Sequence, residues 1–166
     1  MSDASPGSPS MAQRLHTWLE QAVRLEASDL HLVADYAPAL RVHGELQELA
    51  EPRLSHDELR ALAEMICSAE QLTRLAQHKN VDFSHEQRIG DGARRFRASL
   101  FFASGSHGAC FRVVPAKFPT FSWAEFPESL AHRLAQVRDG LVIVTGSTGS
   151  GKSTTLAMIV NLLNQA

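Results

Sequence analysis

A glycine-rich loop near the C-terminal end holds the residues best suited to chemistry. Residues 146–153 read Gly-Ser-Thr-Gly-Ser-Gly-Lys-Ser and satisfy the pattern G-x-x-x-x-G-K-[ST]. Glycines at fixed positions permit backbone conformations with positive φ, so main-chain N–H groups can converge on an anion. A helix that begins at the loop directs its free N–H groups at the same anion. The predicted nucleotide-binding residues are Gly146, Ser147, Thr148, Gly149, Ser150, Gly151, Lys152, Ser153 and Thr154.

The side chains at the end of this loop predict ATP with Mg²⁺ as the ligand. The ammonium group of Lys152 can oppose the β- and γ-phosphate oxygens, and the hydroxyl of Ser153 can bind magnesium. Thr154 is placed to donate a hydrogen bond near the α-phosphate. A merely flexible Gly-Ser turn is the alternative, and the Gly-Lys-Ser ending between an apolar run and a helical pattern disfavours it.

The residues around the loop predict a strand–loop–helix unit. Leu-Val-Ile-Val at 141–144 is typical of a strand buried on both faces of a parallel sheet, and residues 153–165 carry the apolar stripe of a helix. ATP hydrolysis also needs carboxylates that hold magnesium and orient water, and these follow the loop in P-loop folds. We therefore expect the catalytic residues beyond residue 166. The chain is then predicted to be part of a longer protein, with little ATPase activity by itself.

The residues before the loop predict a mixed module of helices and strands. Apolar positions recur every three or four residues over 12–26, which indicates an amphipathic helix. Ser55 followed by Glu58 is a capping-box pattern, which indicates the start of a second helix. A short third helix is predicted over 69–77. Alternating, aromatic and β-branched residues predict antiparallel strands within 30–34, 39–49, 81–87, 94–104 and 108–115.

Changes in composition divide the chain into four segments. Residues 1–11, rich in Ser, Pro and Gly, predict a flexible N-terminus, and residues 12–115 form the mixed module. Prolines then mark a linker, so residues 116–137 are predicted as linker and helix, with the helix over 122–137. Residues 138–166 begin the P-loop domain. The fold class is α/β of the α+β kind, with a mostly antiparallel sheet and flanking helices.

The bulk composition excludes several classes of protein. With 44% hydrophobic residues, 20% charged residues and a net charge of −2, the chain resembles an average globular protein and lacks the basic excess of a nucleic-acid binder. The two cysteines and eight histidines have no metal-ligand spacing, so no metal site is predicted among them. No apolar run approaches the roughly 18–20 residues that span a bilayer, and no signal peptide is present, which predicts a cytoplasmic protein.

Several strings in the sequence together resemble the N-terminal part of the PilT-like type IV pilus retraction ATPases. They are LEASDLHLVADYAPALRVHGEL, VDFS, RRFRASLFF, FRVVP and RDGLVIVTGSTGSGKSTTLAMIVNLLN. The loop pattern alone is common to P-loop NTPases, whereas its combination with SDLHL at this distance is much more specific. The resemblance runs from Leu25 to the end of the chain.

The resemblance implies a PAS-like N-terminal domain, joined by a short linker to the first strand, P-loop and helix of a RecA-like ATPase domain. It also implies the ATP-binding subunit of a homo-hexameric motor that drives pilus retraction and twitching motility. Such a motor is peripheral to the inner membrane, where it acts on platform proteins without spanning the bilayer and without nucleic acid.

Two arginines of the mixed module take a functional role from the same resemblance. Arg97 and Arg112 look like the arginines of the N-terminal domain that approach nucleotide phosphates at a domain or subunit interface, a role that suits the guanidinium fork. An arginine on an exposed strand is also often only a surface ion pair. For the SDLHL string we expect structural roles, with Asp29 as a turn or cap residue and His31 as a packed strand residue.

Departures from the family leave alternatives open. Ser147 stands where proline is common, and the segment FASGSHGA lacks the Asn-Gln and Arg-Gly residues that retraction ATPases often have there. A type II secretion or pilus-assembly ATPase therefore stays open, as does a non-catalytic assembly or regulatory module. A small kinase is disfavoured because a full-sized module precedes the loop.

Overall fold

The chain forms two compact units, Met1–Val114 and Pro115–Ala166. The structure is a computed structural model and describes residues 9–103, 105–115, 119–147 and 150–165. Residues 1–8 of the predicted flexible N-terminus lie outside this part of the chain. Met11, the last residue of that predicted segment, already belongs to the first helix.

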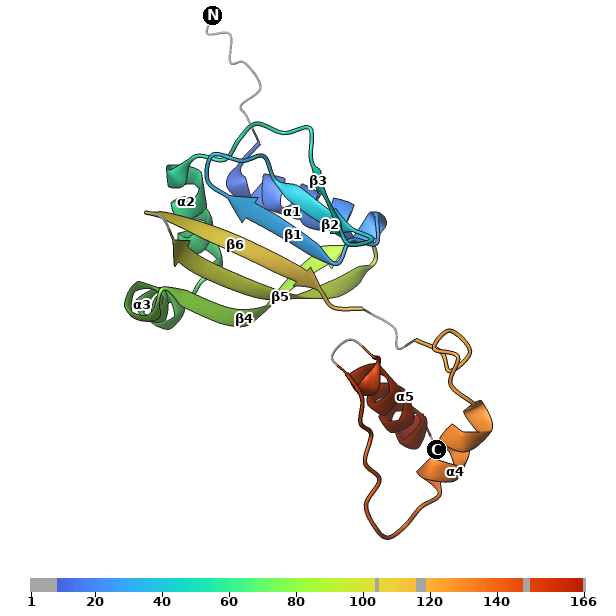
Figure 1. Cartoon of the computed structure of the whole chain (residues 1–166). Coiled ribbons are helices and arrows are strands. Elements are labelled where there is room, and N and C mark those ends of the chain that lie inside the picture. The colour runs from blue at the N-terminus through green and yellow to red at the C-terminus, as the bar shows by residue number, and fades with distance from the viewer. Residues whose placement is uncertain (1–8, 104, 116–118, 148–149, 166) are drawn as a thin grey trace, which may run out of the picture. The chain divides into compact units, whose positions relative to one another are not determined.

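The first unit is built on a six-stranded sheet in which every pairing is antiparallel (Figure 1). The strand order is β3-β2-β1-β6-β5-β4. The antiparallel sheet predicted from the sequence is therefore confirmed. The strands are β1 (Asp29–Val33), β2 (Ala39–Val42), β3 (Glu45–Glu48), β4 (Asn80–Ile89), β5 (Gly92–Ala103) and β6 (Ser106–Val113).

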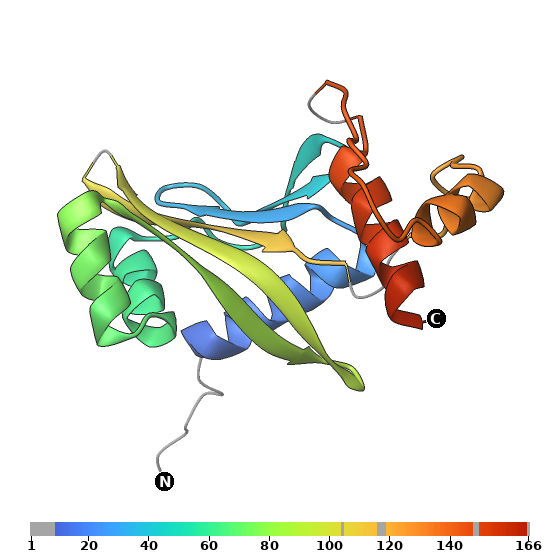
Figure 2. The same cartoon turned by 90° about the horizontal axis from the view of Figure 1, so that it is seen from below.

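Three helices lie on one side of this sheet (Figure 2). They are α1 (Met11–Arg24), α2 (His56–Ile66) and α3 (Ala69–His78), close to the predicted ranges. The predicted capping box at the start of α2 is confirmed: the Glu58 N–H donates to Ser55 Oγ at 3.2 Å, and the Ser55 N–H donates to Glu58 Oε2 at 2.7 Å. Each bond satisfies a backbone donor that a helix end leaves free.

The core of the first unit lies between the helices and the sheet. Trp18 and Leu19 of α1, Phe96 of β5 and Phe111 of β6 are fully buried there. Because strand side chains alternate between the two faces, the neighbours of these strand residues point away from the helices. Those neighbours include Arg97 and Arg112, so the core fixes which face of the sheet carries the arginines.

The second unit contains α4 (Glu128–Ala135) and α5 (Lys152–Gln165). The predicted helix at 122–137 is wrong in its first half, because α4 begins only after Pro127. Proline disfavours the helical conformation of the residue before it, here Phe126, so a helix does not run through this point. Instead, residues 121–125 form hydrogen-bonded turns. Among the described residues, no helix has both the length and the apolarity needed to cross a membrane.

The strand predicted at 141–144 is also wrong for this chain. These residues belong to no strand, and Leu141 and Ile143 are 82% and 71% exposed. The sequence has the apolarity of a strand buried on both faces, but such a strand needs neighbouring strands to pair with its N–H and C=O groups. The second unit provides no such neighbour among its described residues.

Candidate functional site

The glycine-rich loop at residues 146–153 combines glycine conformations with the start of a helix. Gly151 has φ of +86°, a conformation that residues with a Cβ rarely adopt, and α5 begins at the next residue. At Gly146, an added Cβ would lie 2.8 Å from Ser150 Oγ. Gly146 also has a positive φ, of +153°, so the backbone favours glycine at both positions. Two residues of the predicted site, Thr148 and Gly149, lie outside the described residues.

Lys152 lies across its own loop. Its Nζ donates a hydrogen bond to the Ser147 carbonyl oxygen at 2.6 Å. The loop is narrowed further by a bond from the Ser150 N–H to the same carbonyl at 3.3 Å. An ammonium group is a strong donor for an anion, and an anion that bound Lys152 would have to displace the Ser147 carbonyl.

The donor set of the loop fits a polyphosphate with magnesium. The first-turn N–H groups of α5 have no partner within the helix, and the first turn contains no acidic side chain that would repel an anion. Ser153 is exposed and offers a hydroxyl as a magnesium ligand, while Thr154 is partly buried beside it. These groups match the chemistry that the sequence predicts for ATP and Mg²⁺.

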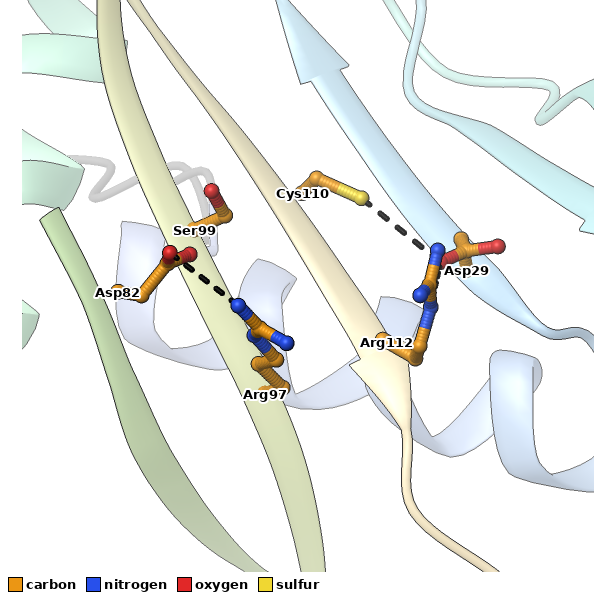
Figure 3. Close-up of a pocket in the computed structure, with 6 residues that line it drawn as sticks. All are labelled: Asp29, Asp82, Arg97, Ser99, Cys110 and Arg112. Carbon is orange, nitrogen blue, oxygen red and sulfur yellow. Dashed lines mark hydrogen bonds and ion pairs between the residues drawn. The ribbon is translucent and has the colours of Figure 1, made fainter. Parts of the chain in front are cut away.

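A row of charged side chains crosses the sheet face that points away from the helices. Arg97 of β5 lies directly opposite Arg112 of β6, and Arg112 lies directly opposite Asp29 of β1. Two like charges in this position repel each other, so each arginine requires an anionic neighbour. Arg112 Nε donates to Asp29 Oδ1 at 2.8 Å, and Arg97 Nη2 donates to Asp82 Oδ2 at 3.3 Å (Figure 3).

The charged row borders an open cavity of about 330 Å³. Its lining residues come from four strands and are Asp29, Asp82, Arg97, Ser99, Cys110 and Arg112 (Figure 3). The side chains of Arg97 and Arg112 remain 66% and 67% exposed. Both guanidinium groups therefore keep free N–H donors after each has bound its carboxylate.

Asp29, at one end of this row, is its buried carboxylate. Its side chain is only 6% exposed, and its Oδ2 accepts a hydrogen bond from the Ser28 hydroxyl at 2.8 Å. Burial alone would raise the pKa of Asp29, but the hydrogen bonds from Arg112 and Ser28 and the charge of Arg112 together lower it. The same hydrogen bond raises the pKa of Arg112. The pair is therefore ionised over the whole neutral range.

Cys110 and His31 occupy the same face but carry no charge at neutral pH. Burial, and next the negative charge of Asp29, raise the pKa of the Cys110 thiol. Burial and the nearby Arg41 lower the pKa of His31. The fixed charges that line the cavity therefore come from arginine and aspartate.

The structure corrects the role expected for Asp29, whereas the phosphate-contacting roles of Arg97 and Arg112 stay predictions. Asp29 is neither a turn nor a cap residue, because it lies within β1 and binds Arg112 across the sheet. His31 is a half-buried strand residue, as expected. The structure brings Arg97 and Arg112 together, and their contact with a phosphate remains a prediction. Asp82 was missed by the sequence analysis, although its alternation with Val81 and Phe83 places it on the arginine face.

The loop sequence satisfies the pattern that is common to P-loop NTPases, and a mixed α/β unit precedes it. Comparison with known proteins gives the family. Residues 5–166 match the family described as type II/IV secretion system protein. The chain belongs to this family, and its resemblance to the PilT-like secretion ATPases is confirmed.

Individual relatives point the same way. The chain is 40% identical over 138 residues to the type IV pilus retractation ATPase PilT of Pseudomonas aeruginosa, covering 83% of this chain and 39% of that protein. It is 33% identical over 133 residues to the twitching motility protein of Neisseria gonorrhoeae, covering 80% of this chain and 34% of that protein. The chain thus spans little more than a third of these relatives.

A solved structure is similar to this chain over most of its length. The crystal structure of the pilus retraction motor PilT with bound ADP matches with a TM-score of 0.79 and 38% identity, over 90% of this chain and 43% of that one. The mixed α/β fold class is therefore confirmed. The ADP belongs to that protein.

Proposed function

We propose that this chain is the front portion of an ATP-hydrolysing motor of the secretion type, with residues 146–154 as its nucleotide loop. The single observation that carries the proposal is the helix start at Lys152, preceded by Gly151 with φ of +86°. This backbone aims the free N–H groups of α5 into the loop, beside an ammonium group. The ADP in the similar crystal structure supports the same ligand class.

Each side chain of the loop has a separate task in this proposal. Lys152 exchanges its bond to the Ser147 carbonyl for one to the β- and γ-phosphates. Ser153 holds Mg²⁺ through its hydroxyl, and Thr154 binds the α-phosphate. Magnesium bridges the phosphate oxygens and neutralises their charge. The carboxylates that orient water and complete the magnesium site lie, in this proposal, beyond residue 166.

The arginine face supplies the second part of the proposed site. Arg97 and Arg112 contact nucleotide phosphates at a domain or subunit interface, because both keep exposed N–H donors while their carboxylates hold them in register. Asp29, buried and ionised, fixes the direction of the Arg112 fork. A positioned guanidinium group stabilises charge that develops on a transferring phosphoryl group.

The names of the relatives support the biological setting that we propose. We propose a homo-hexamer that drives type IV pilus retraction and twitching motility, in the cytoplasm and peripheral to the inner membrane, acting on platform proteins rather than on nucleic acid. The identity of 40% to a pilus ATPase favours retraction over the type II secretion and pilus-assembly alternatives. The PAS-like and RecA-like domain assignments, with bounds at 12–115 and 138–166, are part of this proposal.

Phosphate release by the full-length protein tests the enzymatic part. We expect ATP-dependent release by the full-length protein and loss of at least about tenfold in rate when either arginine becomes alanine. Residues 1–166 alone should release almost none, because they lack the magnesium-binding and water-orienting carboxylates. Turnover by residues 1–166 at the rate of the full-length protein would refute the proposal that essential carboxylates follow this segment.

A further inference from the structure

A cavity with an exposed tryptophan lies beside the glycine-rich loop, within the second unit. A cavity of about 400 Å³ joins the turn at 123–125 to the loop and the first turn of α5. Its lining includes Trp123, Glu125, Ser150, Gly151, Thr154 and Thr155. The volume falls within the range of about 300–1,000 Å³ that is typical of small-molecule sites.

Trp123 lies in a turn that leaves its side chain exposed to solvent. The residue is 72% exposed, which is unusual for the largest apolar residue type. The backbone N–H of Trp123 donates to Thr120 Oγ1 at 3.1 Å, and the backbone N–H of Phe126 donates to the Phe121 carbonyl oxygen at 2.9 Å. The rings of Phe121 and Phe126 pack with centroids 6.1 Å apart and close the base of the turn. The backbone therefore presents the indole to the cavity at little conformational cost.

The position of Thr154 relates this indole to the nucleotide. In the proposed function Thr154 binds the α-phosphate, which is the phosphate that carries the nucleoside. Thr154 and Trp123 line the same cavity. In the proposed binding mode, the nucleoside that is attached to the α-phosphate therefore extends from Thr154 into the cavity that Trp123 lines.

We propose that Trp123 stacks on the heterocyclic base of a nucleoside polyphosphate, an inference that rests on the proposed nucleotide site. The exposed indole is a flat aromatic surface on which a base can stack, and the cavity of about 400 Å³ that it lines lies beside the loop. Stacking is tolerant of the base because every base has a π-face. The larger purines gain more area than the pyrimidines, so the site favours ADP and ATP over UDP and UTP.

Binding of two probes by the full-length protein tests the stacking. Inorganic tripolyphosphate occupies only the phosphate loop, whereas ADP with Mg²⁺ occupies the loop and the aromatic cavity. Trp123→Ala should weaken ADP binding about tenfold, since stacking on one base contributes at that scale, and leave tripolyphosphate binding within about twofold. Trp123→Phe should retain most of the ADP affinity. Tyr36→Ala, which removes another exposed aromatic from the first unit, serves as the control and should change neither affinity.

Fluorescence gives an independent readout. ADP should quench indole emission in the unaltered protein, and the quenching should disappear in Trp123→Phe while tripolyphosphate quenches in neither. Equal weakening of both probes by Trp123→Ala would overturn the inference, because Trp123 would then support the loop rather than the base. Unchanged ADP affinity would overturn it as well. Failure of the unaltered protein to bind either probe would instead refute the proposed nucleotide site, and the inference with it.

Discussion

Replacement of the buried carboxylate of Asp29 tests how the charged row on the sheet is stabilised. Asp29→Asn keeps the shape of the side chain but removes its charge. Asp29 accepts bonds from Arg112 at 2.8 Å and from Ser28 at 2.8 Å, and its side chain is 6% exposed. The variant therefore changes a charge-assisted network without opening a cavity.

The expected loss of stability in Asp29→Asn follows from these two hydrogen bonds. A hydrogen bond to a charged group contributes about 1.5–3 kcal/mol, and charge-assisted bonds are about twice as strong as neutral ones. The loss to Asn is reduced further because the Arg112 side chain is 67% exposed and screened by solvent. We expect the free energy of unfolding of the first unit to fall by about 1–2 kcal/mol. The urea midpoint should fall by about 1 M.

Urea unfolding of the chain, followed by the emission of buried Trp18, measures this change. The control is Asp82→Asn, which removes the partner of Arg97 at an exposed pair with side chains 53% and 66% exposed. That variant should lower the stability by less than about 0.5 kcal/mol. Equal effects of the two substitutions would refute the conclusion that Asp29 differs by its burial.

The pH dependence of stability is a second test of the contribution of ionised Asp29. The folded pKa of Asp29 lies below its ordinary value of 3.8, so its contribution is fully present above that value and is lost as the pH falls through the folded pKa. The stability difference between the unaltered chain and Asp29→Asn should therefore be constant from pH 5 to pH 8 and shrink below about pH 4. A difference that persists undiminished at the lowest pH at which the chain still folds would contradict the ionised state assigned to Asp29.

Three further outcomes are expected from the same unfolding assay. Ser55→Ala should cost about 1 kcal/mol through loss of the helix cap, whereas an unchanged urea midpoint would argue against that cap. Leu19→Ala should cost about 2–5 kcal/mol, because Leu19 is fully buried in the core; a cost below 1 kcal/mol would contradict this packing. Burial lowers the pKa of His85 and His107, so the folded state favours their neutral forms. Stability should then decrease as the pH falls below about 6.5, and a urea midpoint equal at pH 5 and pH 8 would contradict the direction of these shifts.

Local signals in the sequence predicted most of the first unit. The capping box of Ser55 and Glu58 fixed the start of α2 because both partners lie within one helical turn. The same signal was present but missed at Ser68, which forms a capping box with Gln71 at the start of α3. The strands were predictable because alternation of apolar residues requires only that one face be buried.

Features that depend on distant partners could not be predicted in the same way. Asp29 is polar and follows a serine, so its local context is that of a turn, and only the pairing of β1 with β6 places it beside Arg112. The apolar residues at 141–144 have the composition of a buried strand, but a strand forms only when neighbours pair with it. Pro127, by contrast, was a local signal for the start of α4 and was passed over in favour of helical spacing.

The glycine-rich part of the candidate site could be predicted because glycine is the residue type that readily adopts a positive φ. The need for glycine at 151 follows directly from its positive φ, and the position of Lys152 follows from the motif. Trp123 carries no such signal, because its place beside the loop depends on the turn that Thr120 and Phe126 close. The place of Trp123 beside the loop is therefore visible only in the folded second unit.

Binding of MgATP to the full-length protein, measured by calorimetry with and without Lys152→Ala, tests the central claim most directly. We expect the unaltered protein to bind one nucleotide per loop, and the variant to lose at least about a hundredfold in affinity, because no other side chain of the loop supplies a positive charge. Equal affinity in the two proteins, or no binding by the unaltered protein in any state of assembly, would contradict the assignment of residues 146–154 as the nucleotide loop.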